Sequence, residues 1–361
     1  MKKYFSASVR LLFAAAAIAA VPLTAPSTAQ ADTTIVPIFT CPMGCGLPAT
    51  QTALAAQMAR AGSDVLPAAQ ETPGFMYNIR AMADESNWKK VVFGTEDTVI
   101  QAAFHGGSPE LQKFVPKPIP IKFKLLYGEG LVAQGKFFVT FDPDIQSIAD
   151  LKGKRVALGL PTQSDWGMTA SLLLEHAYGI TPENTDIRHV TPPVMTQQLI
   201  DGTTDAALMA LITNADGNIW WTNSLTSKLD ASGKTIRYLP VTEEAIDTIN
   251  EKFDMTLLKI KVPAGSLPDQ DKELLVGGNR IYEAVHPSFP EDVAYKLVKA
   301  VAEFGPKLRE SGQGIWRFWS PTNMVAGLSE ENAHPGAIKA YKELGWWENR
   351  KNYEPVTYPK Q

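Results

Sequence analysis

The sequence predicts an α/β fold made of two similar lobes that share one cleft. The first observation is the stretch 150–168, in which the short apolar run 156–160 leads into a polar loop. A stretch with a broad apolar helical face, 169–178, follows, so that a buried strand passes through a loop into a helix. The second observation is that this order occurs near the start as well, where the β-branched run 33–39 precedes a loop and an Ala-rich helix over 50–60.

The loop 161–167 is a candidate anion site. The first N–H groups of the following helix lack partners and carry the positive end of the helix dipole, beside the hydroxyls of Thr162 and Ser164. Ser164 or Asp165 can equally act as an ordinary helix cap. The recurrence of the unit favours the binding interpretation, because ligands of open α/β sheets lie at the carboxyl ends of strands.

Residues 1–31 are expected to form an export signal. Basic residues precede the apolar run 11–21, and the small residues at 29–31 fit a cleavage pattern that leaves Asp32 at the mature terminus. The apolar run is too short to span a bilayer, and no cysteine directly follows the cleavage site. We therefore expect a soluble protein of the periplasm.

Composition limits the partner and supports two lobes. The 361 residues are 45% hydrophobic and 20% charged, with a formal net charge of −4 and no basic run, which argues against nucleic acid. The mature chain is longer than the roughly 250–300 residues at which a single core stops growing.

Cys41 and Cys45 are the only cysteines. They frame the first loop as Cys-Pro-Met-Gly-Cys, and the periplasm permits disulfides, so a bond between them is expected, with free thiols as the alternative. Such a short bridge would stiffen the cleft more than it stabilises the fold. A metal site is disfavoured because two thiolates leave a tetrahedral site half empty.

The remaining elements follow in order. In the first lobe, a strand is expected at 65–68, a helix start at Thr72-Pro73, and a strand at 91–94 that leads through Thr95-Glu96-Asp97 into a helix at 98–104. Thr72 and Asn78 can either cap a helix or face a ligand. Strands at 124–127 and 136–141 come next, and the chain is expected to cross between lobes at 139–143.

The second lobe and the return to the first are predicted in the same way. The expected elements are a helical turn at 147–152, strands at 188–190, 204–211 and 236–239, helices at 194–202 and 243–253, and a return strand at 257–263. From 271 onward we expect helices at 273–285, 290–310 and 336–344 that pack on the first lobe.

Several short motifs, in a consistent order over almost all of the mature chain, carry a family resemblance. They are the Gly-rich loop 44–52, Glu71-Thr72-Pro73-Gly74-Phe75 with Asn78, Gly94-Thr95-Glu96-Asp97, the stretch 147–160, Gly202-Thr203-Thr204-Asp205-Ala206, Pro263-Ala264-Gly265-Ser266 and His334-Pro335-Gly336-Ala337-Ile338. The chain resembles the TAXI-family solute-binding receptors of tripartite ATP-independent periplasmic (TRAP) transporters.

The resemblance implies a type II periplasmic binding protein fold, with two α/β lobes joined by crossing hinge strands and a ligand cleft between them. Lobe limits of 32–141 and 263–361 for the first lobe and 142–262 for the second would follow. The implied function is capture of a small organic anion or amino acid, such as a dicarboxylate or glutamate, and its delivery to a TRAP-type membrane permease. Binding would select the closed arrangement of the lobes.

The same resemblance implies a set of ligand-binding residues in five loops. These residues are Gly46, Thr50, Gln51, Thr72, Asn78, Thr95, Glu96, Thr162, Ser164, Asp165, Trp166 and Asn214.

The chain departs from the family pattern by placing carboxylates near the expected pocket. The usual residue at Glu96 is uncharged, and Glu71 and Asp165 add further acids. A zwitterion, an amine or a metal-bridged acid therefore competes with a plain dicarboxylate as the ligand. An aromatic wall or a cation–π contact could come from Trp166, Trp220 or Tyr77. The alternative is that these acids simply face solvent.

Two other classes of protein compete with this interpretation. An ABC-type substrate-binding protein would share the fold, and a secreted hydrolase with a carboxylate pair would need two acids that meet only in space. The sequence contains no Gly-x-Ser-x-Gly, His-Glu-x-x-His or Walker motif, and its five His residues are dispersed. We expect a binding protein without catalytic residues, cofactor or metal.

Overall fold

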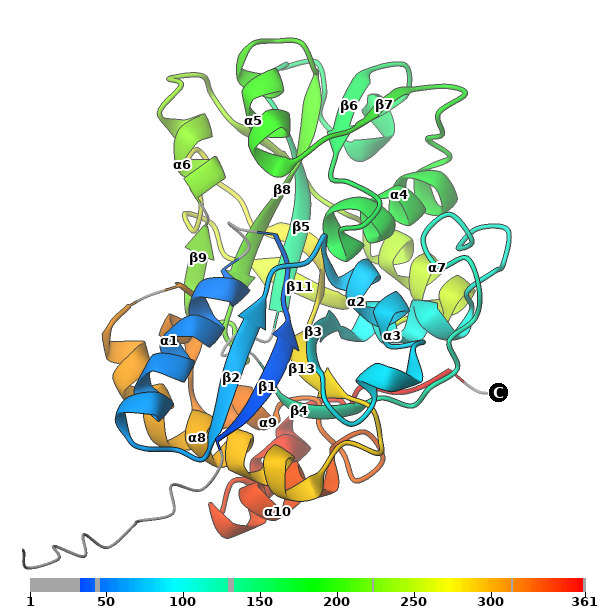
Figure 1. Cartoon of the computed structure of the whole chain (residues 1–361). Helices are drawn as coiled ribbons and strands as arrows, with labels where there is room; N and C mark the ends of the chain where they lie inside the picture. Colours follow the sequence, from blue (N-terminus) through cyan, green and yellow to red (C-terminus); the bar gives the residue numbers. More distant parts are fainter. Residues whose placement is uncertain (1–32, 43–45, 129–132, 223, 313, 360–361) are drawn as a thin grey trace, which may run out of the picture. The chain divides into compact units, whose positions relative to one another are not determined.

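The first of two β-sheets has the strand order β2-β1-β3-β13-β4 (Figure 1). Strands β1, β2 and β3 are parallel, and β13 runs antiparallel between β3 and β4. The strands are β1 (Thr34–Phe39), β2 (Val65–Gln70), β3 (Val92–Glu96), β4 (Lys124–Gly128) and β13 (Ile281–Val285). This computed structural model describes residues 33–42, 46–128, 133–222, 224–312 and 314–359.

The second sheet repeats the same order. Its central part runs β7-β6-β8-β5, with β10 paired to the outer side of β5, and β5 is antiparallel to both β8 and β10. These strands are β5 (Ala133–Thr140), β6 (Arg155–Leu158), β7 (Asp186–His189), β8 (Ala206–Thr213) and β10 (Arg237–Leu239). The sheet is completed by β9 (Trp220–Thr222), β11 (Leu258–Val262) and β12 (Leu274–Asn279).

Each sheet receives its antiparallel strand from a chain segment that arrives from the other sheet. The chain passes from β4 to β5 between Gly128 and Ala133, and it returns from β12 to β13 through the single residue Arg280. Two α/β lobes of equal topology joined by two crossing segments are the arrangement of the type II periplasmic binding fold, so the predicted fold class is confirmed. We call the part built on the first sheet lobe 1 and the part built on the second sheet lobe 2.

The helices lie around their own sheets (Figure 1). Lobe 1 carries α1 (Leu47–Arg60), α2 (Phe75–Ala81), α3 (Asp97–Phe104), α8 (Glu291–Glu310), α9 (Pro321–Val325) and α10 (Pro335–Glu343). Lobe 2 carries α5 (Pro192–Ile200), α6 (Ser224–Asp230), α7 (Glu243–Phe253) and one mixed helix, which consists of the π-helical turns η3 (Ser164–Thr169) and η4 (Leu173–Ala177) around α4 (Ala170–Leu172). Among the described residues, no helix is both long enough and apolar enough to cross a membrane.

Burial explains why the strongest sequence patterns gave correct elements. Strand β8 is buried at almost every position because it lies between β5 and β6, which accounts for its nearly continuous apolar run. Helix α7 begins where the Thr242 side chain accepts a hydrogen bond from the Ala245 N–H, and its buried residues recur at helical spacing. Its predicted range, 243–253, is confirmed.

The predicted helix at 273–285 is wrong, because this segment forms the two strands β12 and β13. A short apolar run does not distinguish a buried strand from a buried helix, and Gly277 and Gly278 in its middle disfavour a helix. The predicted return strand 257–263 is β11, which stays in lobe 2 and pairs with β12. The sheets change near 128–133 and at Arg280, whereas we expected crossings near 141 and 262; the lobe limits as such stay a prediction.

Two predicted helix starts also move. Helix α2 begins at Phe75 with Gly74 before it, two residues later than expected from Thr72-Pro73. The helix expected from residue 169 begins at Ser164 with a π-helical turn, so part of the predicted loop 161–167 is helical.

The two lobes touch where Gly74 of lobe 1 meets the backbone of Thr162 in lobe 2. A Cβ atom at Gly74 would lie 2.6 Å from the Thr162 carbonyl oxygen, and Gly74 has a φ of 134°. Only glycine tolerates both the contact and the backbone conformation. The close contact between the lobes at this point therefore depends on glycine, which has no side chain, at residue 74.

We expect Gly74→Ala to hold the lobes apart. The added methyl group would clash with rigid backbone, so the variant should have a larger radius of gyration in small-angle X-ray scattering and a lower thermal midpoint. Gly62→Ala is the matched control, since Gly62 also has a positive φ of 71° but would meet no atom within 4 Å. Equal behaviour of the two variants would show that backbone strain alone, and not the lobe contact, is responsible.

Candidate functional site

The carboxyl ends of two strands meet where the lobes touch. Strand β3 ends at Glu96, and the loop after β6 leads into the π-helical turn that starts at Ser164. The Ser164 hydroxyl donates a hydrogen bond of 2.5 Å to Oε2 of Glu96. This bond joins lobe 2 to lobe 1, and both side chains are almost fully buried.

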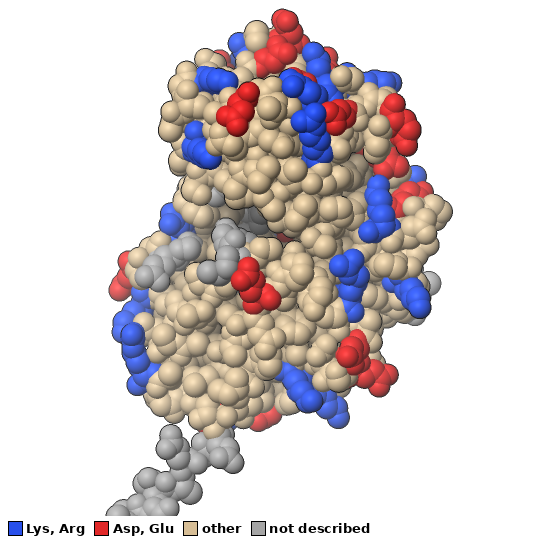
Figure 2. All heavy atoms as spheres, turned by 45° about the horizontal axis from the view of Figure 1, so that its top comes forward, with Lys and Arg blue, Asp and Glu red and all other residues tan. Residues whose placement is uncertain are grey.

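Asp165 and Trp166 both contact Lys136. Lys136, on β5, forms an ion pair with Asp165, and both side chains are less than a tenth exposed. The Lys136 ammonium also lies 4.8 Å from the centre of the Trp166 ring, a cation–π distance. We refer to Glu96, Lys136, Ser164, Asp165 and Trp166 as the cleft cluster. Figure 2 shows the face that is hollowed between the two lobes.

The π-helical turn directs Ser164 towards lobe 1. The N-cap residue Gln163 makes no side-chain cap bond, and its side chain instead accepts a hydrogen bond from the Leu160 N–H. In the first turn, Oδ1 of Asp165 accepts a hydrogen bond from the Trp166 N–H at 2.7 Å. Gly159 permits the tight turn, because a Cβ atom there would lie 2.4 Å from the Trp166 Cβ. Of the two interpretations of Ser164 left open by the sequence, capping does not apply, and its hydroxyl is used between the lobes. Single π-turns in helices are frequent at functional sites.

The electrostatics of the cluster favour a neutral Glu96. Burial raises the pKa of the Glu96 carboxyl well above its ordinary value, and the negative charge of Asp165 raises it further. Lys136 and the Ser164 hydrogen bond lower this pKa, but they do not reverse the direction. Burial of Glu96 while the lobes are in contact therefore favours its protonated form, which limits the net charge buried at the site.

Two predicted ligand-binding residues of lobe 1 donate their side-chain hydrogen bonds to backbone carbonyls. The Thr72 hydroxyl donates to the Thr40 carbonyl at 2.7 Å. The Asn78 amide donates to the carbonyls of Phe39, Thr40 and Gly94 at 3.2, 2.7 and 2.9 Å. Together they hold the ends of β1 and β3 side by side, which is a structural task next to the cleft cluster.

Other predicted residues serve the start of α1 and the neighbouring strand. Gly46 precedes α1 with a φ of 96°, and the Thr50 hydroxyl donates to the Gly46 carbonyl at 2.9 Å. The Gln51 amide donates to the buried Glu283 carboxylate at 3.0 Å. The Thr95 hydroxyl, also buried, lies 3.4 Å from the Glu96 carbonyl.

The remaining predicted ligand-binding residues, Asn214 and Thr162, lie in lobe 2. Asn214 folds its own loop, because its Oδ1 accepts from the N–H groups of Asn218 and Ile219. Thr162 contributes its backbone at the Gly74 contact. Of the three unexpected acids, Glu96 and Asp165 are buried and Glu71 is exposed.

The predicted bond between Cys41 and Cys45 stays a prediction, because Cys45 lies outside the described residues. Cys41 is buried at the end of β1 and is not a free thiol.

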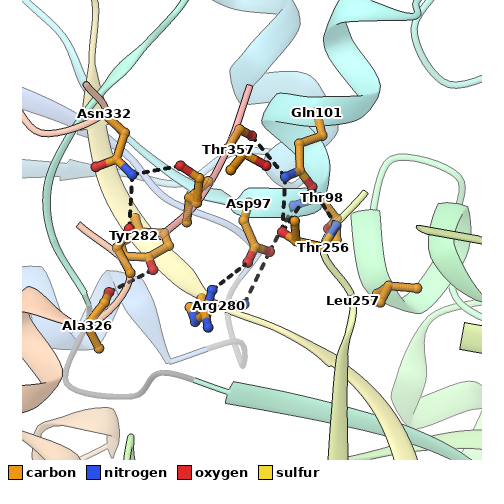
Figure 3. Close-up of polar contacts among 12 residues, drawn as sticks. Asp97, Thr98, Gln101, Thr256, Leu257, Arg280, Tyr282, Ala326, Asn332 and Thr357 are labelled. Atoms are coloured by element: carbon orange, nitrogen blue, oxygen red, sulfur yellow. Dashed lines mark hydrogen bonds and ion pairs between the residues drawn. The ribbon is translucent and has the colours of Figure 1, made fainter. Parts of the chain in front are cut away.

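A second group of buried polar residues lies at the crossing point between the lobes (Figure 3). The Asp97 N–H donates to the Arg280 carbonyl, and the Arg280 N–H donates to Oδ1 of Asp97, both at 3.2 Å. The Arg280 guanidinium lies 3.9 Å from Oδ2 of the same carboxylate, and both side chains are buried. Burial raises the pKa of Asp97 to about 6, although Arg280 acts in the opposite direction.

Gln101 extends this group to lobe 2 and to the end of the chain (Figure 3). Its amide donates to the Thr256 hydroxyl and to the Thr357 carbonyl, both at 3.0 Å, and its Oε1 accepts from the Thr256 N–H at 3.0 Å. Gln101 lies on α3, about one helical turn after Asp97. One helix of lobe 1 therefore contacts the crossing residue, lobe 2 and the C-terminal segment.

Sequence reasoning missed Lys136 and Arg280. Lys136 lies in the predicted strand 136–141, and the signal for its role is a charged residue at the start of an apolar run. Arg280 was hidden inside the wrongly predicted helix 273–285. Among the described residues, no group of three or more His, Cys, Asp or Glu side chains is placed to hold a metal ion.

Comparison with known proteins gives a family and several distant structures. The model of the NMT1-like family matches residues 132–345. A sulfonate-binding protein described as part of an ABC transporter from Methylobacillus flagellatus KT is 15% identical, with 91% of this chain and 99% of that chain covered and a TM-score of 0.46. The periplasmic aliphatic sulphonate binding protein SsuA from Escherichia coli is 14% identical, with 88% and 83% covered and a TM-score of 0.43. XAC2383 from Xanthomonas citri, bound to chloride ion, is 11% identical, with 89% and 100% covered and a TM-score of 0.44.

Glu96→Gln should remove a pH-dependent loss of stability. Because folding raises the pKa of Glu96, its contribution to stability is greatest at low pH and is lost as pH rises above the ordinary carboxyl value. Glutamine keeps an acceptor for Ser164 without titrating. We expect the variant's thermal midpoint, relative to the wild type, to increase steadily between pH 5 and pH 8.

The control for this experiment is Glu273→Gln, at an exposed position. Its difference from the wild type should stay constant over the same pH range. A constant difference for Glu96→Gln as well would show that Glu96 titrates normally in the folded protein.

Arg280→Met should destabilise the protein at pH 7.5 but not at pH 5. The wild-type protein ionises a buried Asp97 with a pKa of about 6, and without Arg280 the carboxyl would stay protonated instead. Since a tenfold change in protonation is worth about 1.4 kcal/mol, the lost charge interaction costs about 2 kcal/mol at pH 7.5 and close to nothing at pH 5. Urea unfolding at both pH values measures this.

Arg237→Met is a suitable control, because Arg237 is exposed on β10. If Arg280→Met lost the same free energy at both pH values, packing of the arginine and not its charge would account for the loss.

Proposed function

Since the chain belongs to the NMT1-like family, we propose that it is an extracytoplasmic solute-binding protein that captures a small organic acid or amino acid between its lobes. The observation that carries the proposal is the cleft cluster. In a fold of two lobes, the polar strand ends of both lobes converge on one buried point through the Ser164–Glu96 hydrogen bond and the Lys136–Asp165 ion pair. Binding energy that brings the lobes together selects the closed arrangement.

The mechanism that we propose is binding without chemical conversion. Lys136 and the hydroxyl of Ser164 supply positive charge and a donor in lobe 2, while Glu96 supplies a carboxyl group from lobe 1. A ligand between the lobes would exchange its own polar groups for the direct contacts seen here. Because the cluster is buried, these interactions are stronger than they would be in water.

The partner and the location complete the proposal. We propose that the signal at residues 1–31 directs the protein to the periplasm and that it delivers its ligand to a TRAP-type permease, as the TAXI resemblance implies. A bond between Cys41 and Cys45 would stiffen the first loop beside the cleft. An ABC permease is the alternative partner, and a gene for an ATPase in place of a fused permease beside the gene of this protein would favour it.

A thermal-shift screen followed by calorimetry tests the proposal. We expect at least one organic acid or amino acid from a panel of dicarboxylates, monocarboxylates and amino acids to raise the thermal midpoint, because it binds only the folded state. Ser164→Ala should weaken binding of that ligand by about fivefold to tenfold, the effect expected for the loss of one hydrogen bond. Ser227→Ala, at an exposed position on α6, should bind like the wild type.

The absence of any shift across the panel would contradict the proposed ligand class. Turnover of a panel compound by the purified protein would contradict the proposal of binding without conversion.

A further inference from the structure

A small cavity lies in lobe 2 directly behind the Lys136–Asp165 ion pair. Its volume is about 20 Å³, enough for one water-sized group. Most of its wall is apolar and comes from β5, β8 and α7, for example Phe138, Leu208 and Ile246. Its polar residues are Lys136, Asp165, Thr169 and Asn279.

Two of these polar groups are buried without a partner. Asn279 is 2% exposed and Thr169 is 8% exposed, yet Nδ2 of Asn279 and the hydroxyl of Thr169 have no hydrogen-bond partner among the residues that the structure describes. Native proteins rarely leave buried donors unpaired, since each one costs about 1–3 kcal/mol. Both groups line the same small cavity, so an external acceptor is the simplest way to satisfy them.

Lys136 belongs both to the lining of this cavity and to the cleft cluster. Its ammonium forms the ion pair with Asp165, which also lines the cavity, and lies 4.8 Å from the centre of the Trp166 ring. The cavity lining thus contains three residues with donor groups, Lys136, Thr169 and Asn279. Ammonium, hydroxyl and amide donors together match the oxygens of a carboxylate.

We propose that Lys136, Thr169 and Asn279 form the carboxylate subsite of this receptor and that the Asp165 side chain occupies it in place of the ligand. This inference rests on the proposed function and deepens it, because it names the group of the ligand that is held and the residues that hold it. The ligand carboxylate displaces Asp165 from Lys136 and gains the unpaired donors of Thr169 and Asn279. Movement of Asp165 supplies the room that the cavity itself lacks.

The position of Asn279 links this subsite to the crossing between the lobes. Asn279 is the last residue of β12, and the next residue, Arg280, carries the chain into lobe 1. A carboxylate bound to the Asn279 amide is therefore one residue from the point at which the chain crosses between the lobes. Occupancy of the subsite and the arrangement of the lobes are coupled through the backbone at this point.

Variants that are expected to change ligand affinity in opposite directions test the proposal. In calorimetric titrations of the purified protein with acetate, succinate and glutamate, Lys136→Met and the nearly isosteric Thr169→Val should weaken binding, by about tenfold or more and by about fivefold respectively. Asp165→Asn should strengthen binding several-fold, because it removes the internal competitor and leaves Lys136 free. Lys261→Met, at an exposed position on β11, should match the wild type.

A merely structural ion pair would give a different result. Loss of either partner would then weaken binding and lower the thermal midpoint in the same direction, so weaker binding by Asp165→Asn would overturn the proposal. Unchanged affinity of Thr169→Val and Asn279→Leu, with thermal midpoints near that of the wild type, would also overturn it.

A crystallographic probe separates failure of the subsite from failure of the proposed function. If the wild type binds none of the three acids, crystals of Asp165→Asn soaked in bromide still report on the subsite. An anomalous peak within hydrogen-bond distance of Lys136, Thr169 and Asn279 would support it. An ordered water molecule at that position, with no bromide, would overturn it.

Discussion

The pairing of Asp97 with Arg280 fixes the point at which the chain passes from one lobe to the other. Arg280 is the single residue between a strand of each sheet, and both its N–H and its carbonyl are held by Asp97. The pair is buried, so neither partner can be lost without leaving an uncompensated charge or taking up a proton. Helix α3, which begins at Asp97, then carries Gln101 to lobe 2 and to the C-terminal segment. The orientation of the lobes is defined around this one helix start.

Burial of charge governs the cleft cluster in the same way. Glu96 and Asp165 are two acids beside one lysine, and the pKa of Glu96 rises because burial and the charge of Asp165 disfavour its ionised form. Favouring the protonated form of Glu96 limits the negative charge that is buried beside Lys136.

Elements defined by interactions between residues close in sequence can be predicted, whereas elements defined by distant partners cannot. The strand, loop and helix units could be predicted because their apolar runs and turn residues are local, and α7 is an example. The segment 273–285 could not, since its strands are defined by partners in β3, β4, β5 and β11. Ser164 and Asp165 were found from the loop pattern, but Lys136 acquires its role only from a partner 29 positions later. The sequence indicates a polar role for Thr72 and Asn78. Their hydrogen bonds to backbone carbonyls could not be predicted, because these carbonyls belong to distant segments that only the fold brings close.

The position of β13 in lobe 1 also determines the order in which the lobes can be completed during synthesis. All strands of lobe 2 are contained in residues 133–279, so its sheet can form as soon as that segment is available. Strand β13 lies between β3 and β4, and it emerges only after the whole of lobe 2. Until then, the edges of β3 and β4 that face β13 are unpaired, and unpaired edges invite association with other chains. The first strands of lobe 1 are synthesised before lobe 2, but its sheet is complete only when β13 has followed lobe 2. The incomplete sheet of lobe 1 is therefore the folding intermediate that is most exposed to aggregation.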